Sequence, residues 1–345
     1  MQNRNIKISK CLGGGIICHN IFEKIISLEN LFSAWREFKK GRTKKKDVLQ
    51  FELNLEDNIF SLYNELKNKI YCHLNYTSFC IKDPKLRKIH KAIVKDRVLH
   101  HAIFRILYPI FDRYFVFDSY SCRNGKGTYE AITQLNKFTK KVSKNNIRNC
   151  YVLKCDIKKY FDSIDQEILL NLIRIKIKDE SAIWLVERVI KSFPAGLPLG
   201  NITSQLFANI YLNELDQFIK HALKQRYYIR YCDDFVVLSE NKDFLENLVF
   251  KIDNFLENNL KLSLHKGKII IEKYRQGVDF LGYKSFPNYR ILRTKTKKRI
   301  LDKAKEKLGI ESLISYLGIL KHCKSRKIKM KLLKSYFSID KIYKI

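Results

Sequence analysis

The feature that most constrains this chain is a pair of adjacent acids inside an apolar segment. Asp233 and Asp234 interrupt the run Tyr227-Tyr-Ile-Arg-Tyr-Cys-Asp-Asp-Phe-Val-Val-Leu238. The aromatic and β-branched residues on both sides predict two strands that turn at the acids. Two carboxylates at such a turn repel each other and are partly desolvated, which raises a pKa unless a cation compensates. Alone, an Asp-Asp pair is more often an ordinary surface turn.

A third acid closes a second predicted strand. Asp156 ends the segment Tyr151-Val-Leu-Lys-Cys-Asp156, whose preceding residues are suited to burial. Three carboxylates that converge from strand ends can hold two metal ions about 3.5–4 Å apart, the geometry of two-metal phosphoryl transfer. An all-oxygen ligand set suits Mg²⁺, with Mn²⁺ as a possible substitute. We therefore expect Asp156, Asp233 and Asp234 to be catalytic and to hold two Mg²⁺ ions.

The charge balance points to a polyanionic partner. The chain has 345 residues, with 67 Lys and Arg against 35 Asp and Glu, a formal charge of +32. Nucleic acid is the usual partner for such an excess, since each neutralised phosphate releases condensed counterions. Lysine enrichment in an AT-rich genome is the alternative, but it would not by itself leave acids this scarce.

The cysteines and the apolar runs bear on the compartment. The nine cysteines show no C-x-x-C pair and no Cys/His quartet with zinc spacing. We expect them to be reduced, as in a cytoplasmic protein. No run approaches 18 apolar residues, so no membrane span is expected.

Periodicity predicts a mixed α/β (α+β) fold. Helical spacing of apolar residues alternates with short β-branched and aromatic runs. Helices are expected in 21–70 with a break at 41–46, and over 96–111, 164–177, 203–223, 242–260 and 296–308; strands are expected at 76–81, 151–156, 227–238 and within 268–292. Residues 291–345 hold 17 Lys and Arg and only 4 acids, so we expect this basic segment to contact a nucleic-acid backbone.

Several segments in order resemble the boxes of reverse transcriptases, in particular group II intron-like bacterial enzymes. The middle segments match the boxes of the catalytic domain, two upstream segments match the fingers boxes, and two downstream segments match the last palm boxes. They are Ile89–Val98, Asp118–Gly127, Cys155–Asp165, Gly196–Asn209, Tyr231-Cys-Asp-Asp234, Leu260–Lys268 and Val278–Tyr283. Any one box alone would be weak, but seven in order over about 85–285 make a strong resemblance.

The resemblance implies a right-hand polymerase fold. It divides the chain into an N-terminal helical segment at 1–70, fingers at 71–150, a catalytic palm at 151–285 and a basic helical thumb at 286–345. Part of 178–200, inside the palm range, contributes to the fingers. It adds the backbone carbonyl of Ile157 to the metal ligands.

The same resemblance assigns the binding residues. Phe161 falls at the steric gate that excludes a ribose 2′-hydroxyl, although a core phenylalanine is the plain alternative. Arg97 suits the triphosphate better than Lys95, because a guanidinium grips phosphate bidentately. Arg123 contacts the template or caps a local turn. The implied nucleotide-binding residues are Lys95, Arg97, Phe161, Leu199, Gly200, Gln205 and Lys266, and the implied nucleic-acid-binding residues are Arg123, Lys295, Lys297, Lys298 and Arg299.

One departure from the family pattern is informative. Many reverse transcriptases have Gln-Gly where this chain has Leu199-Gly200, and Ser-Pro where it has Ser204-Gln205. Leu199 lacks the polar group that would touch the incoming nucleotide, so discrimination between bases should fall. This pattern is similar to the reverse transcriptases of diversity-generating retroelements. That resemblance implies adenine-directed errors in cDNA copied from a template-repeat RNA, with dNTPs, the RNA/cDNA duplex and an oligomeric accessory variability protein as partners.

Two alternatives remain. One is a group II-like or defence-associated bacterial reverse transcriptase with another RNA partner. The other is a catalytically silent RNA-binding protein on the same scaffold. The three intact acids argue against the second, since a binding protein has no reason to keep mutually repelling carboxylates in a basic cleft.

Overall fold

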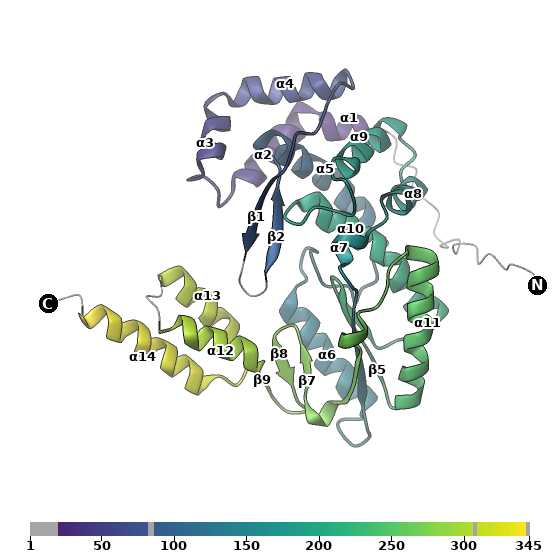
Figure 1. Cartoon of the computed structure of the whole chain (residues 1–345), viewed down its shortest axis with the longest axis vertical. Helices are drawn as coiled ribbons and strands as arrows, with labels where there is room; N and C mark the ends of the chain where they lie inside the picture. The colour runs from purple at the N-terminus through teal and green to yellow at the C-terminus, as the bar shows by residue number, and fades with distance from the viewer. Residues whose placement is uncertain (1–19, 82–85, 306–308, 343–345) are drawn as a thin grey trace, which may run out of the picture. The chain divides into compact units, whose positions relative to one another are not determined.

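The computed structural model describes residues 20–81, 86–305 and 309–342, and it confirms the mixed α/β fold (Figure 1). The chain divides into two compact units. The first combines the described residues up to Phe117 with Ile157–Leu223 and Ile252–Leu264. The second combines Asp118–Asp156, Lys224–Lys251 and the described residues from His265 onward. No helix in the described part of the chain is both long and apolar enough to span a membrane.

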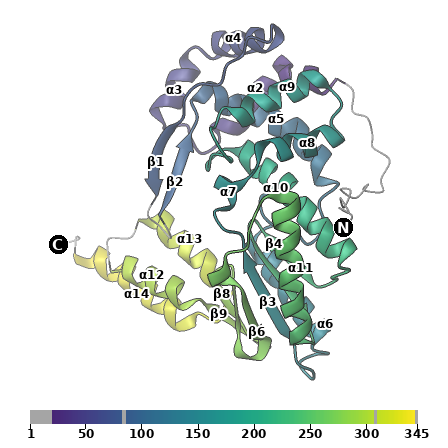
Figure 2. The same ribbon diagram turned by 45° about the vertical axis from the view of Figure 1, so that its right-hand side comes forward.

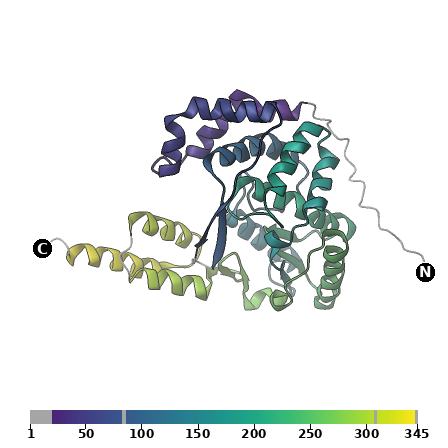
Figure 3. The same cartoon turned by 45° about the horizontal axis from the view of Figure 1, so that its top comes forward.

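The first unit is built mainly of helices around α5. The expected helical region at 21–70 is confirmed but is divided into several helices, and the predicted helix at 96–111 begins two residues earlier. The strands β1 (Thr77–Ile81) and β2 (Arg87–Lys91) form an antiparallel ribbon that precedes α5, visible as the dark blue pair in Figure 3. The helices are α1 (Ile21–Ile26), α2 (Leu28–Lys39), α3 (Lys46–Leu53), α4 (Leu55–Lys67), α5 (Val94–Asp112), α7 (Tyr160–Ser163), α8 (Gln166–Lys176), α9 (Glu180–Lys191) and α10 (Ile202–Gln217), which a π turn extends over Phe218–Ala222.

Side-chain caps set where two of these helices begin. Asp165 accepts hydrogen bonds from the backbone N–H groups of Glu167 and Ile168, so α8 begins at Gln166 and not at the predicted Ile164. Asp179 caps α9 in the same way. A carboxylate at this position satisfies N–H groups that have no partner within the helix. α5 then packs against α2 and α10, with Val98, Ala102 and Ile103 fully buried.

The second unit contains the sheet that carries the predicted acids. Its strand order is β4 (Tyr228–Tyr231), β5 (Asp234–Ser239), β3 (Tyr151–Asp156) and β6 (Ile270–Lys273), all antiparallel. The helix α6 (Thr128–Val142) packs on β4 and β5 (Figure 2). α11 (Lys242–Leu260) follows β5 along the chain and ends in the first unit.

The C-terminal part of the second unit joins a small sheet to basic helices. The strands β7 (Val278–Phe280), β8 (Tyr283–Ser285) and β9 (Arg290–Leu292) pair in sequence order. They lead into α12 (Thr294–Lys303), α13 (Ile310–Leu320) and α14 (Arg326–Ile342). The helix predicted at 296–308 therefore begins and ends earlier, and its expected residues 306–308 lie outside the described part. Ile300, Leu313 and Leu332 bury the apolar faces of the three helices.

Candidate active site

The register of β3 and β5 places two of the predicted acids opposite each other. Asp156 pairs with Asp234 at the end of a ladder that begins with Tyr151 and Ser239. Residues directly opposite in an antiparallel pair lie on the same face, with Cβ atoms about 4.5–5.5 Å apart. Asp233 precedes Asp234 at the turn from β4, as the sequence predicted. The fold thus brings the three acids to one end of the sheet.

A buried arginine supports this turn. Cys232 has a φ of 58°, the left-handed conformation that a tight hairpin turn requires. The Arg230 guanidinium is fully buried and donates a hydrogen bond to the Cys232 carbonyl at 3.1 Å. The backbone N–H of Arg230 donates to the Asp118 backbone carbonyl at 3.0 Å, and the Arg230 carbonyl accepts from the Tyr120 backbone N–H at 2.9 Å. The Arg230 side chain therefore holds the turn itself, and backbone hydrogen bonds to Asp118 and Tyr120, which precede α6, hold the strand that leads into it.

The negative charges of Asp156, Asp233 and Asp234 are only partly compensated by nearby lysines. Burial, together with the neighbouring carboxylate of Asp156, raises the pKa of Asp233. Burial raises the pKa of Asp234 to about 6, and the charges of Asp233 and Asp156 add to it against the opposing effect of Lys154. Lys268 Nζ lies 2.7 Å from Asp156 Oδ1. A bound cation would relieve the remaining repulsion.

The donor chemistry of the acids suits a hard divalent cation, because all their side-chain donors are oxygens. Within the described residues, however, no three His, Cys, Asp or Glu side chains are arranged as a ready metal site. The Asp156 carboxylate forms an ion pair with Lys268. To hold an ion, this carboxylate would have to release Lys268 or bind both cations at once. Ile157, whose carbonyl the resemblance added, is buried and bridges Leu264 in the first unit.

Lys268 and Arg230 are the residues that sequence reasoning missed near the acids. Lys268 is the last residue of the segment Leu260–Lys268, but only the fold shows that it, and not Lys266, contacts Asp156. Lys266 is exposed in the same 3₁₀ turn, Lys266–Lys268. Arg230 lies in the segment Tyr227–Leu238. A charged residue among apolar neighbours there was the sequence signal that could have identified its structural role.

In the first unit, the loop before α10 is tied to Phe161. The Leu197 N–H donates to the Phe161 carbonyl at 2.8 Å. Gly196 has a φ of +66°, and a Cβ there would lie 2.3 Å from the same carbonyl, so only glycine fits. The Phe161 ring is half-buried and stands edge-on to Tyr160. Two sequence boxes, about 35 residues apart in the chain, are thus neighbours in the fold.

Further along this loop, three predicted nucleotide-binding residues share one pocket. The pocket has a volume of about 200 Å³ and contains Arg97, Gly200 and Gln205. Leu199 is half-buried beside it, and its carbonyl accepts a hydrogen bond from the His90 N–H at 2.9 Å. The pocket is lined by Arg42, Arg97, His100, His101, Gly200, Asn201, Ile202 and Gln205, of which Arg42, the two histidines, Asn201 and Ile202 were not predicted.

The remaining predicted residues are dispersed. Lys95 forms an ion pair with Glu65, with both carboxylate oxygens 2.9 Å from its Nζ. Arg123 donates to the Ser119 carbonyl at 3.1 Å, a contact within its own turn, and its expected contact with the template stays a prediction. Lys295, Lys297 and Lys298 are exposed on α12, where Arg299 is half-buried.

Comparison with known proteins defines the class. Residues 81–285, more than half of the chain, match the family described as Reverse transcriptase (RNA-dependent DNA polymerase), and the chain belongs to this family. Among curated relatives, protein YkfC of Escherichia coli K12 is 27% identical over 58% of this chain and 63% of its own length. The group II intron-encoded protein LtrA of Lactococcus lactis subsp. cremoris is 25% identical over 62% of this chain and 46% of its own length.

The matches cover only part of these relatives, less than two thirds of either. Among solved structures, the telomerase of Candida albicans in complex with a fragment of telomeric RNA has a TM-score of 0.51 at 11% identity. The match covers 78% of this chain and 55% of that one. This likeness concerns the fold alone.

Proposed function

We propose that this protein is an RNA-directed DNA polymerase that extends a primer with dNTPs, using Asp156, Asp233 and Asp234 to bind two Mg²⁺ ions. The observation that carries the proposal is the register that sets Asp156 opposite Asp234, with Asp233 beside it and the pKa of both hairpin acids raised. When bound, the ions would activate the primer 3′-hydroxyl and offset the charge of the leaving pyrophosphate.

The chain's own residues have distinct tasks in this proposal. The three carboxylates bind the cations, and Arg230 holds the turn that presents Asp233. Phe161 excludes a ribose 2′-hydroxyl from the incoming nucleotide. The basic helices α12–α14 contact the phosphates of the template and product strands, as their lysines suggest. This proposal retains the fingers, palm and thumb at the predicted boundaries.

Primer extension on an RNA template with Mg²⁺ or Mn²⁺ tests the proposal. Asp233→Ala should reduce extension at least about a thousandfold, because removing a metal ligand removes transition-state stabilisation of several kcal/mol. Asp243→Ala, which removes an exposed acid in the same unit, is the matched control and should extend like the parent. Equal extension by the two variants would refute the site. RNA binding without extension by the parent would favour the catalytically silent alternative.

We further propose that the enzyme serves a diversity-generating retroelement and makes adenine-directed errors with an accessory variability protein as partner. Leu199 supports this, since a leucine offers the incoming nucleotide no hydrogen bond. Sequencing the cDNA made on a template of even composition tests it. Errors should concentrate opposite adenine, and Leu199→Gln should lower their frequency. Errors spread evenly over the four template bases would favour the group II-like alternative.

A further inference from the structure

The pocket at the start of α10 is strongly electropositive. Arg42 and Arg97 both stand over the Phe38 ring, at 5.1 and 4.5 Å from its centroid. Burial and the nearby Arg42 charge lower the pKa of Arg97. The closest acid, Asp47, is 3.9 Å from Arg97 but 2.5 Å from Lys91, so it is shared among cations. The pair of guanidinium groups is therefore only partly compensated.

The helix end in the same pocket has no anionic cap. The first turn of α10 contains no acidic residue, and the Asn201 side chain does not cap the helix. Asn201 instead donates its amide to the His90 carbonyl at 3.2 Å. The N-terminus of a 16-residue helix favours an anion through its backbone N–H groups and its dipole.

His100 provides a second, independent indication of a ligand. Its side chain is 1% exposed and lines the pocket, yet its Nδ1 has no hydrogen-bond partner. Burial lowers the pKa of His100 well below its usual range, and a polar contact with Asn201 opposes this shift, although no hydrogen bond of ordinary length and angle reaches Nδ1. A buried polar atom without a hydrogen-bond partner costs free energy. Such an atom at the wall of a pocket therefore indicates a ligand that supplies the missing hydrogen bond.

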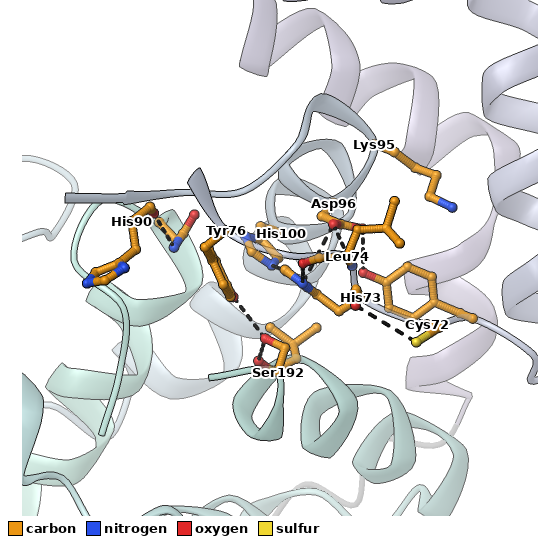
Figure 4. Close-up of polar contacts among 12 residues, drawn as sticks. Cys72, His73, Leu74, Tyr76, His90, Lys95, Asp96, His100 and Ser192 are labelled. Carbon is orange, nitrogen blue, oxygen red and sulfur yellow. Dashed lines mark hydrogen bonds and ion pairs between the residues drawn. The ribbon is translucent and has the colours of Figure 1, made fainter. Parts of the chain in front are cut away.

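A series of polar contacts leads from Asp96 through Leu74 and His73 to His100 (Figure 4). Asp96 is fully buried and accepts from Tyr71 Oη at 2.8 Å and from the Leu74 N–H at 3.1 Å. His73 Nδ1 lies 2.6 Å from the Leu74 carbonyl, which can only accept, so this nitrogen carries a proton. His73 Nε2 lies 3.2 Å from His100 Nε2. In the tautomer in which His73 Nε2 accepts, His100 donates through Nε2, and His100 Nδ1 is then a hydrogen-bond acceptor.

The size and chemistry of the pocket restrict its ligand. About 200 Å³ is less than small-molecule pockets usually offer, so the pocket suits a group smaller than a whole nucleotide. The guanidinium groups and the helix end suit a phosphate, whereas a bare imidazole nitrogen needs a hydrogen-bond donor. A phosphate with an adjacent hydroxyl group combines both requirements, and the ribose 2′-hydroxyl is the donor that distinguishes RNA from DNA.

We propose that this pocket binds one ribose-phosphate unit of an RNA backbone, with the phosphate held by Arg42, Arg97 and the α10 N-terminus and the 2′-hydroxyl donating to His100 Nδ1. The choice of RNA rests on the proposed function, but the site does not take part in the chemistry. It changes the role of Arg97 from a triphosphate ligand to an RNA ligand. Binding measured in EDTA therefore separates it from the polymerase proposal.

The experiment measures dissociation constants of the full chain for a labelled single-stranded RNA and the DNA of the same sequence, in EDTA at several salt concentrations. The variants are Arg42→Gln and His100→Phe, with Arg36→Gln as the control that removes an exposed arginine of α2 outside the pocket. Arg42→Gln should weaken RNA binding about three- to tenfold more than Arg36→Gln and reduce the salt slope by about 1. His100→Phe should reduce the RNA preference about three- to tenfold, the effect of one lost hydrogen bond, without changing the slope.

Each other outcome decides against the proposal. Equal binding by the Arg42 and Arg36 variants would exclude a phosphate at this position. Competition of dATP with RNA in the parent, lost in Arg42→Gln, would assign the phosphate to the nucleotide substrate. If thermal melting shows that His100→Phe is unfolded, RNA carrying 2′-deoxy substitutions replaces it on the parent protein. No affinity lost at any substituted position would contradict the hydroxyl contact.

Discussion

The guanidinium of Arg230 is a charge kept entirely inside the protein, a costly arrangement unless its donors are satisfied. Replacing it by methionine leaves the Cys232 carbonyl without this donor and loosens the turn that carries Asp233. We expect Arg230→Met to lower the free energy of unfolding by about 2–4 kcal/mol. Urea denaturation measures this change. Arg226→Met, which removes an exposed arginine just before β4, is the control and should change stability by less than about 0.5 kcal/mol.

In the proposed function, Lys268 and a metal ion would compete for the Asp156 carboxylate. Lys268→Ala removes a positive charge 2.7 Å from Asp156, so the acids attract a cation more strongly. The Mg²⁺ concentration for half-maximal primer extension should fall about two- to tenfold. Lys251→Ala, which removes an exposed lysine of α11 in the same unit, is the control and should leave the requirement close to that of the parent. An equal shift in both variants would indicate a general effect of charge and not this ion pair.

At the scale of the element, the cap of α8 ties helix formation to a charge. Burial raises the pKa of Asp165, but the hydrogen bonds from Lys261 at 2.6 Å and from two backbone N–H groups outweigh it, so the pKa is lowered. Such a group stabilises the fold above its unfolded pKa of 3.8, and the effect is lost as pH falls through the lower folded pKa.

Asp165→Ala should accordingly cost about 0.5–2 kcal/mol at pH 7, the usual value of an N-cap. The difference from the parent should shrink below pH 4. Thermal melts at pH 7, 5 and 3.5 measure it, and Asp243→Ala is the exposed control. A difference that stays constant over this range would mean that the carboxylate charge does not contribute.

Local periodicity predicted most elements, because helix and strand spacing depends on neighbouring residues. The hairpin Tyr227–Leu238 and the strand Tyr151–Asp156 are examples, and both are confirmed. Boundaries such as the start of α8 depended on a single cap. The strand order β4-β5-β3-β6 was not predictable, since it pairs β3 with β5 across 78–88 residues of chain and with β6 across 116–122 residues.

The same limit applies to the candidate site. The three acids stand out locally, because a charge inside an apolar strand is visible in the sequence. Lys268 contacts Asp156 across 112 residues of chain. Arg42 and His100 line one pocket although 58 residues separate them. Local spacing in the sequence cannot reveal either pairing. The roles assigned to Phe161, Leu199 and the α12 lysines stay predictions.

At the scale of the whole molecule, the contact units do not follow the four segments expected from the family resemblance. Residues 157–223 lie within the expected palm range, apart from the part of 178–200 expected in the fingers, but they pack in the unit that contains the N-terminal helices. A chain that passes repeatedly between two units makes contacts distant in sequence. The division into fingers, palm and thumb therefore remains a functional prediction, separate from packing.

The charge of +32 also acts at this scale. Affinity for a 20-nucleotide single-stranded RNA should fall about a hundredfold or more between 50 and 200 mM salt, as expected when about six phosphates are neutralised. Fluorescence anisotropy measures this dependence. An uncharged peptide nucleic acid of the same sequence is the control and should show almost no salt effect. A flat response with RNA would mean that the excess charge does not contact the backbone.

The loop that carries Leu199 is fixed by its main chain. The Leu197 N–H donates to the Phe161 carbonyl, and the Leu199 carbonyl accepts from the His90 N–H. The Gln166 side chain donates to the Gly196 carbonyl at 3.0 Å. None of these bonds uses the side chain at position 199. That side chain can therefore change in evolution without moving the loop. If position 199 sets base discrimination as proposed, copying accuracy can be acquired or lost by a single codon change while the main chain of the loop is inherited intact.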